Sequence, residues 1–94
     1  MKSEIKSTID RIIRVLNAND ASNWARPFEN LKRDLDIDYY STVYSLKSMF
    51  GGMGSFNDLV LHKDCVPLIK ENNELSDLKD ELYLLLEKAI ESRK

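Results

Sequence analysis

The sequence is poor in residues that form covalent or metal cross-links. Its 94 residues include one cysteine, Cys65, and one histidine, His62. No disulfide can therefore form within the chain, and this pair supplies two of the four ligands that a structural zinc ion requires. The segment DLDID at 34–38 lacks the glycine and the distal glutamate of a calcium-binding loop. No orienting group or oxyanion donor accompanies the Cys/His pair. We expect no metal, no cofactor and no enzymatic activity.

Long apolar runs are missing from the start of the chain, where MKSEIKSTIDRII mixes charged and apolar residues. Such a segment is too polar for a secretory signal or a membrane anchor. Together with the lone cysteine, this pattern favours a cytoplasmic protein that does not enter a membrane. The composition, 43% hydrophobic and 32% charged, is typical of a folded globular protein. We expect one helical domain over residues 1–94.

Glycine is also scarce, and all three glycines lie in FGGMGSFNDLVL at 50–61. Gly51 is predicted to end the preceding helix at positive φ, and Gly52 and Gly54 allow a sharp reversal. Ser55 and Asp58 have the S-x-x-D spacing that caps a new turn. We interpret the loop as structural. The alternative, that the backbone amides of GGMGS bind an anion, lacks the G-x-G-x-x-G or P-loop pattern.

Apolar residues recur at helical spacing in four segments. The first helix should begin after a Ser3 cap, present Ile5, Ile9, Ile12, Ile13 and Leu16 on one face, and end near NAND at 17–20. For the second, over 22–35, either Ser22 is the cap and Pro27 falls in or just after the first turn, or regular helix begins at Pro27. Trp24 should be in the core in both cases.

The third helix, within 36–50, should begin at a cap of Asp36 or Asp38 and run to Phe50, with Tyr40 and Tyr44 widening its apolar stripe. The last should begin at Asn72 or Asn73, and its regular leucines favour packing within the domain over a coiled coil between two copies. Residues 59–69 could pair as a small hairpin, but we favour a short helix to His62 followed by an extended stretch. The predicted fold is all-α: a compact bundle of four main helices, with a glycine-rich turn and a short helix or extended segment between the third and the last.

Charge is divided unevenly along the chain. Residues 1–33 hold seven basic and four acidic residues, a net +3, and residues 34–94 hold seven basic and twelve acidic residues, a net −5. Acidic residues gather at two places: Asp34, Asp36 and Asp38, then Glu71, Glu74, Asp77, Asp80 and Glu81. They are either solvated helix ends that complement the helix dipole, or a surface that attracts a cationic partner. With a pI near 5.4, we expect no nucleic-acid binding.

The segment SMFGGMGSFNDLVL, with NWA…F before it and NNE…L…LY.L after it, resembles a family of small uncharacterised bacterial proteins over about residues 20–90. The matching positions are Trp24, Ala25, Phe28, Gly51, Gly52, Gly54, Ser55, Phe56, Asn57, Asp58, Leu59, Asn73, Glu74, Leu78, Leu82 and Tyr83. Cys65 stands where this resemblance leads us to expect the glycine of a K-N/D-G turn. A tight turn there is therefore in question.

Members of this family resemble small cytoplasmic proteins encoded beside secreted or contact-delivered bacterial toxins. The resemblance implies an immunity protein that binds one cognate toxin domain, such as a nuclease, and blocks its active site. The partner surface is then expected to contain Asp34, Asp36, Asp38, Glu71, Glu74 and Asp77, with Tyr39 and Tyr40 as anchors. The alternative is a non-enzymatic helical adaptor or a self-associating module such as a homodimer.

Overall fold

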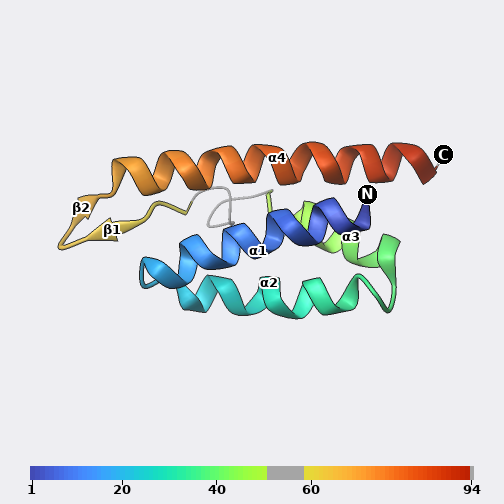
Figure 1. Ribbon diagram of the computed structural model, residues 1–94, viewed down its shortest axis with the longest axis horizontal. Helices are drawn as coiled ribbons and strands as arrows, with labels where there is room; N and C mark the ends of the chain where they lie inside the picture. Colours follow the sequence, from blue (N-terminus) through green and yellow to red (C-terminus); the bar gives the residue numbers. More distant parts are fainter. Residues whose placement is uncertain (51–58, 94) are drawn as a thin grey trace.

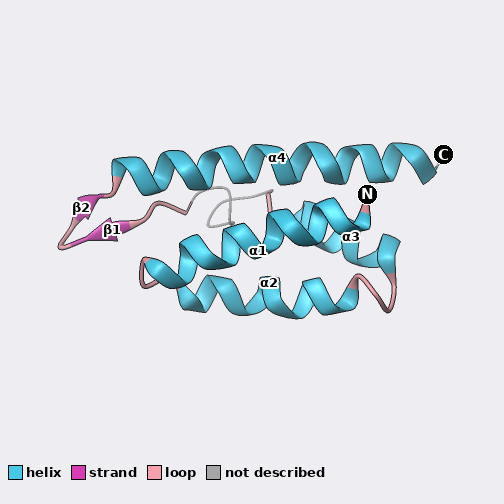
Figure 2. Cartoon of the chain, in the orientation of Figure 1, coloured by secondary structure: helices cyan, strands magenta, loops and turns pink. Residues whose placement is uncertain are grey.

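The protein is an elongated helical bundle in which the first helix lies between the second and the last (Figure 1). The computed structural model describes residues 1–50 and 59–93. In these residues the chain forms α1 (Lys2–Ala18), α2 (Ser22–Asp34), α3 (Tyr39–Ser48), β1 (His62–Lys63), β2 (Val66–Pro67) and α4 (Ile69–Arg93). Helices account for most of the cartoon in Figure 2, and α4 spans most of the 45 Å long axis. The predicted all-α bundle of four main helices is confirmed.

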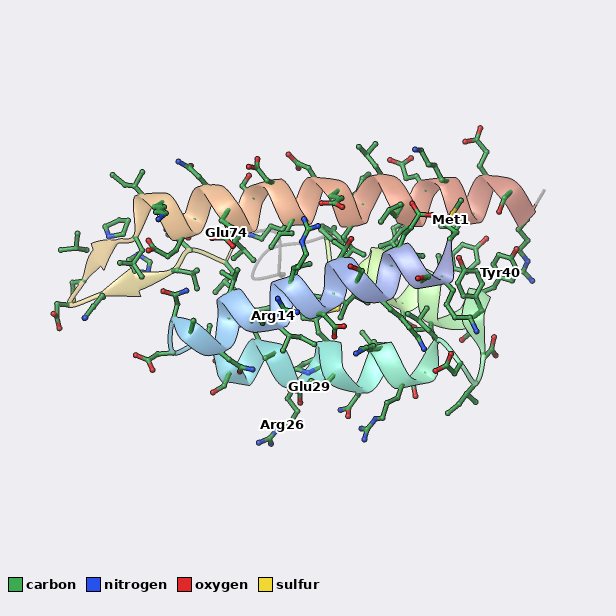
Figure 3. The ribbon with its side chains drawn as sticks, viewed as in Figure 1. Met1, Arg14, Arg26, Glu29, Tyr40 and Glu74 are labelled. Atoms are coloured by element: carbon green, nitrogen blue, oxygen red, sulfur yellow. The ribbon has the colours of Figure 1, made fainter. Side chains whose placement is uncertain are left out.

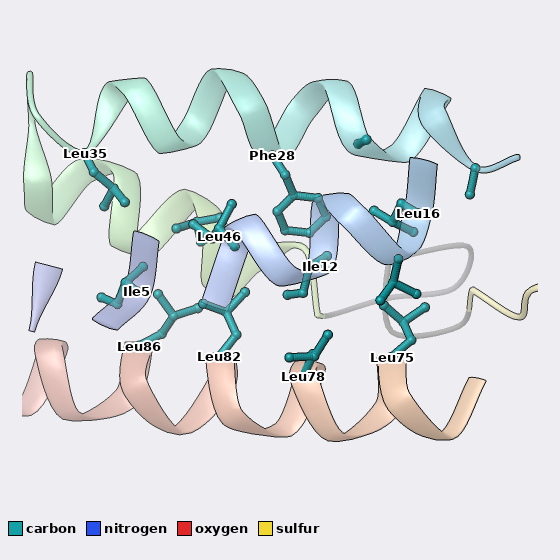
Figure 4. Close-up of a cluster of buried hydrophobic side chains, with 14 of the residues drawn as sticks. Ile5, Ile12, Leu16, Phe28, Leu35, Leu46, Leu75, Leu78, Leu82 and Leu86 are labelled. Atoms are coloured by element: carbon teal, nitrogen blue, oxygen red, sulfur yellow. The ribbon is translucent and has the colours of Figure 1, made fainter. Parts of the chain in front are cut away.

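One apolar core joins the four helices. Its fully buried side chains include Ile5, Ile9, Ile12 and Leu16 of α1, Phe28 of α2, Val43 and Leu46 of α3, and Leu82 and Leu86 of α4. Figure 4 shows the ring of Phe28 pointing from α2 into the centre of this cluster. Of the predicted apolar face of α1, Ile5, Ile9, Ile12 and Leu16 are fully buried and Ile13 is partly buried. This face is covered from both sides because α2 and α4 flank that helix.

Neither of the first two helices begins after its predicted serine cap. α1 begins at Lys2, with Met1 in the cap position, so Ser3 lies inside the helix. α2 begins at Ser22 itself, and the cap position belongs to Ala21. Ala21 is buried, and its N–H donates to the Leu16 carbonyl over 2.9 Å. The start of α2 is therefore fixed by packing of the turn against the core, with no side-chain cap.

Pro27 lies in the second turn of an uninterrupted helix. A helix beginning at Pro27 is therefore wrong. The missing N–H of Pro27 deprives the Asn23 carbonyl, four residues earlier, of its helical partner. Asn23 is exposed, so water can hydrogen-bond to this carbonyl at little cost. Trp24, expected in the core, is partly buried and packs against the core from its edge.

Asp38, one of the two predicted caps, caps α3, which begins at Tyr39. Its carboxylate accepts a hydrogen bond from the Ser41 N–H over 3.3 Å. The helix ends at Ser48, so the prediction that it continues to Phe50 is wrong. The reason is a tightened end, in which the N–H of Phe50 donates to the Lys47 carbonyl three residues earlier. The predicted loop residues lie outside the described residues: Gly51, Gly52, Gly54, Ser55, Asn57 and Asp58.

The last helix begins at Ile69, so a start at Asn72 or Asn73 is wrong. The Asn72 side chain instead binds the backbone of Leu61. Its Oδ1 accepts from the Leu61 N–H over 2.7 Å, and its Nδ2 donates to the Leu61 carbonyl over 3.0 Å. Leu61 is 2% exposed, so the amide satisfies backbone groups that water cannot easily reach. Asn72 thereby fastens the segment before the hairpin to the first turn of α4.

Residues 62–67 form a hairpin, which was the less favoured of the two predictions. Lys63 pairs with Val66 in an antiparallel register. A helix reaching His62 is wrong, because residues 59–61 have no regular structure and His62 is in β1.

The hairpin turn is made by Asp64 and Cys65, which have φ values of 52° and 65°. Two central residues at positive φ are the mark of a type I′ turn, for which Asp-Gly is a preferred sequence. The tight turn that the cysteine put in question is therefore present. Cys65 adopts a left-handed conformation in which its Cβ is crowded by the following carbonyl.

Replacing Cys65 by glycine should stabilise the protein, because glycine has no Cβ to crowd this turn. We expect the free energy of unfolding to rise by about 1 kcal/mol and the melting temperature by about 4–8 °C. Thermal unfolding followed by circular dichroism measures this change. Cys65→Ala is the control that keeps the Cβ, and an equal gain in that variant would contradict the turn-strain explanation.

Replacing Asn72 by alanine should leave the buried N–H of Leu61 without its acceptor. The expected loss of unfolding free energy is about 1–3 kcal/mol, measured by chemical denaturation. Asn73→Ala, at an exposed neighbouring position in the same turn, should change stability by much less. Similar losses in the two variants would show that helix propensity, not the contact with Leu61, explains the effect.

Candidate functional site

Basic residues of α1 form ion pairs with acidic residues on both sides of it. Lys2 Nζ lies 3.3 Å from Asp36 Oδ1, and Lys6 pairs with the other carboxylate oxygen of Asp36. On the α4 side, Arg11 Nη2 lies 2.8 Å from Glu81 Oε2. Part of the charge difference between the two halves of the chain is therefore balanced by ion pairs at the surface of the bundle.

Asp36, predicted to contact a partner, is engaged with the chain's own lysines. The hydrogen bond from Lys6, followed by that from Lys2, holds the pKa of the Asp36 carboxyl below its usual value of 3.8. Its side chain is 55% exposed, and ion pairs this open to solvent contribute little individually. Their position matters more, because they join the start of α1 to the connection between α2 and α3. Asp34 is exposed and forms no ion pair with any described residue.

The predicted partner residues fall into two groups instead of one face. One group surrounds the connection between α2 and α3: Asp34, Asp36, Asp38, Tyr39 and Tyr40. The other lies in the first turns of α4: Glu71, Glu74 and Asp77. Figure 3 places Tyr40 and Glu74 toward opposite ends of the molecule. The structure therefore offers two separate candidate surfaces.

The group on α4 lies among basic side chains. Glu74 and Asp77 share a groove of about 270 Å³ with Arg11 and Arg14. Glu71 lines a neighbouring hollow together with Lys63. These cations reduce the negative potential at the start of α4, and with it the attraction for a cationic partner.

The group on α3 combines aromatic rings with acidic residues. The rings of Tyr39 and Tyr40 meet edge to face, with centroids 5.0 Å apart and planes at 73°. Tyr44, one turn after Tyr40, is 47% exposed. We call Tyr39, Tyr40 and Tyr44 the tyrosine patch. Partial burial, with a smaller contribution from Tyr40, raises the pKa of Tyr39, which keeps its hydroxyl neutral as a hydrogen-bond donor.

Two further residues complete this end of the molecule, and neither was singled out from the sequence as a partner contact. Ile37, in the connection before α3, is 82% exposed. Arg93, in the last turn of α4, lies over the ring of Tyr40, with 4.7 Å between its Cζ and the ring centroid. The spacing of Tyr40 and Tyr44 could have indicated a shared helix face, but nothing in the sequence brings Arg93 to them.

Other side chains that could bind a metal or take part in a reaction are scattered or already hydrogen-bonded. Lys79 is almost fully buried on α4, and its Nζ donates to the Leu59 carbonyl over 3.2 Å. Cys65 is an exposed free thiol in the hairpin, where His62 is also exposed. Within residues 1–50 and 59–93, no three histidine, cysteine or acidic side chains gather where they could hold a metal ion.

Among the helices of the described residues, none combines the length and the apolar character needed to cross a bilayer.

One family model, described as a domain of unknown function (DUF6966), matches residues 17–69. This range contains α2, α3 and the hairpin, and therefore includes the tyrosine patch. No curated protein and no solved structure gives a significant match to the chain.

Replacing Asp36 by asparagine should lower stability in a pH-dependent way. A carboxyl whose pKa is lower in the folded state stabilises the protein above its unfolded-state pKa, here about 3.8, and this effect is lost as the pH falls through the folded-state pKa. The variant should therefore melt below the wild type at neutral pH, and the two melting temperatures should converge in strong acid. Asp34→Asn is the control. A difference for Asp36→Asn that persists in strong acid would exclude the ion pairs as its cause.

Proposed function

The chain belongs to the DUF6966 family of domains of unknown function, and we propose that it binds a cognate bacterial toxin domain and neutralises it by covering its active site. The tyrosine patch is the observation that carries this proposal. Tyr44 is exposed, and Tyr39 and Tyr40 beside it are partly exposed. Surface tyrosines are frequent among the residues that dominate binding energy, because the ring buries a large area and orders few torsions on binding. A toxin is suggested as the partner because about residues 20–90 resemble a family of small bacterial proteins, whose members resemble proteins encoded beside toxins.

The patch is held on a rigid support. Asp38 caps α3 directly before Tyr39, and the helix is anchored in the core by Val43 and Leu46, both fully buried. Side chains presented from such a helix lose little freedom on binding, which favours affinity without any conformational change. An inhibitor of this kind needs shape and charge complementarity, and no chemistry of its own.

Acidic residues beside the patch favour a cationic target such as a nuclease. Asp34 and Asp38 are exposed at the connection between α2 and α3, and Asp34 has no ion pair with a described residue. Charges of this kind accelerate association with an oppositely charged protein more than they slow dissociation. The proposal places the protein in the cytoplasm, where the free thiol of Cys65 stays reduced.

A self-associating module is the second candidate, and the hairpin end of the molecule favours it. Val66 is 62% exposed and Ile69 is 75% exposed, close together in sequence at the end of the hairpin and the start of α4. A dimer that covered these two side chains would remove apolar surface from water. This surface lies away from the tyrosine patch, so the two candidate functions predict that different mutations will disrupt binding.

The product of the gene next to that of this protein is the partner to test. Co-expression followed by size exclusion should yield a 1:1 complex, and co-expression should restore growth to cells that make the toxin.

Tyr40→Ala should weaken the complex by about 2 kcal/mol, or about thirty-fold in Kd, with circular dichroism unchanged. Asp34→Lys should mainly lower the association rate.

Glu74→Lys is the matched charge reversal at the other end of the molecule. Calorimetry and stopped-flow association should show little effect of this change. An effect as large as that of Asp34→Lys would move the partner surface to α4. A homodimer without any complex, dissociated by Ile69→Lys, would replace the immunity proposal with self-association.

A further inference from the structure

A cationic side chain already occupies the tyrosine patch in the unbound protein. The Cζ atom of Arg93 lies 4.7 Å from the ring centroid of Tyr40 and 5.9 Å from that of Tyr44. Both distances lie within the range over which the negative face of an aromatic ring attracts a cation. The two rings therefore form a receptor that accepts a guanidinium group.

The contact joins two helices and is open to solvent. Tyr40 and Tyr44 are four residues apart on α3 and so share a helix face. Arg93 is exposed in the last turn of α4, where the unpaired carbonyl groups of the helix end also attract positive charge. Cation–π contacts at exposed positions are weak. Another cation of the same shape can therefore displace Arg93 at a low energetic cost.

We propose that the rings of Tyr40 and Tyr44 bind an arginine side chain of the protein partner, and that Arg93 occupies this site until the partner binds. This inference rests on the proposed function for its protein partner and adds the chemistry of the residue that the partner presents. Arginine suits the site better than lysine, because the planar guanidinium stacks on a ring while its hydrogen-bond donors stay free. Asp34 and Asp38, at the adjacent helix ends, add negative charge.

Arg93 then acts as an internal competitor. A partner arginine gains its contact with the rings only when Arg93 leaves, so the apparent affinity of the site is reduced by the strength of the contact that Arg93 makes. Removing the Arg93 guanidinium should therefore strengthen binding of a guanidinium ligand. The expected gain is about two- to five-fold, the equilibrium equivalent of one exposed cation–π contact.

The test is a titration with an oligo-arginine peptide, followed by nuclear magnetic resonance of the Tyr40 and Tyr44 ring protons and the Arg93 Nε–H. In the wild type, ring and guanidinium signals should shift over the same range of peptide concentration. Arg93→Gln should bind the peptide about two- to five-fold more tightly than the matched control Arg26→Gln. Arg26 lies on α2 and points away from the bundle (Figure 3), so the control corrects for the change in net charge.

Paired ring substitutions separate the receptor from general charge attraction. The double variant Tyr40→Leu, Tyr44→Leu should abolish the difference between the two arginine variants, while Phe at both positions should preserve it, because phenylalanine keeps the ring faces. Circular dichroism checks that each variant is folded. Equal binding by Arg93→Gln and Arg26→Gln would overturn the proposal, and so would equal binding by the Leu and Phe pairs. Oligo-lysine that binds as tightly as oligo-arginine would overturn the preference for guanidinium.

The peptide experiment does not depend on the toxin. Peptide binding as expected, without any toxin complex, would leave the receptor intact and reject the immunity role. A toxin complex of unchanged affinity in the Leu pair would reject the receptor and leave the immunity role.

Discussion

The structure depends on the burial of α1 between α2 and α4. Ile5, Ile9, Ile12 and Leu16 are inaccessible to water, and they contact side chains that α2, α3 and α4 direct into the same cluster. Truncation of a buried isoleucine or leucine in such a cluster costs about 2–5 kcal/mol, a large part of the stability of a domain of this size. The other helices are placed by this contact, and the tyrosine patch inherits its rigidity from it through Val43 and Leu46.

The ion pairs also depend on the central position of α1. Because the basic helix lies in the middle, Lys2, Lys6 and Arg11 meet acidic residues on neighbouring segments, and the opposite net charges of the two halves partly cancel in these surface ion pairs. The predicted partner residues that are acidic lie in two different local environments. The connection between α2 and α3 keeps exposed acidic side chains beside aromatic rings, while the acidic residues at the start of α4 lie among cations. A net charge taken from composition could not distinguish these two environments.

The sequence predicted the helices well but, except at the Asp38 cap of α3, it predicted their first residues poorly, for a physical reason. Apolar spacing reports which face of a helix is buried. Ile5, Ile9 and Ile12 of α1 and Leu75, Leu78 and Leu82 of α4 are buried at that spacing, while Ile13 and Leu85 are only partly buried. A helix start depends on what the preceding turn contacts: Ala21 is held by the core, and Asn72 is used to bind Leu61.

The hairpin and the candidate site were partly predictable for similar reasons. The turn at Asp64 and Cys65 was obscured because cysteine occupies a left-handed position that usually takes glycine. Four residues at this end of the molecule could be proposed from the sequence as partner contacts, and they lie close together in the chain: Asp34, Asp38, Tyr39 and Tyr40. Arg93 could not be proposed in this way, because it reaches the tyrosines only through the packing of α4 along the bundle.

The residues that match the family cover a shorter part of the chain than the residues that form the core. Residues 17–69 carry α2, α3 and the hairpin, yet the apolar faces of those helices are covered by Ile5, Ile9 and Ile12 on one side of the matched range and by Leu82 and Leu86 on the other. An excised polypeptide with only the matched residues would expose Phe28 and Leu46 to water. The part of this chain that matches the family is thus shorter than the part that forms the core, and a recombinant fragment of this protein needs both flanking helices to keep that core covered.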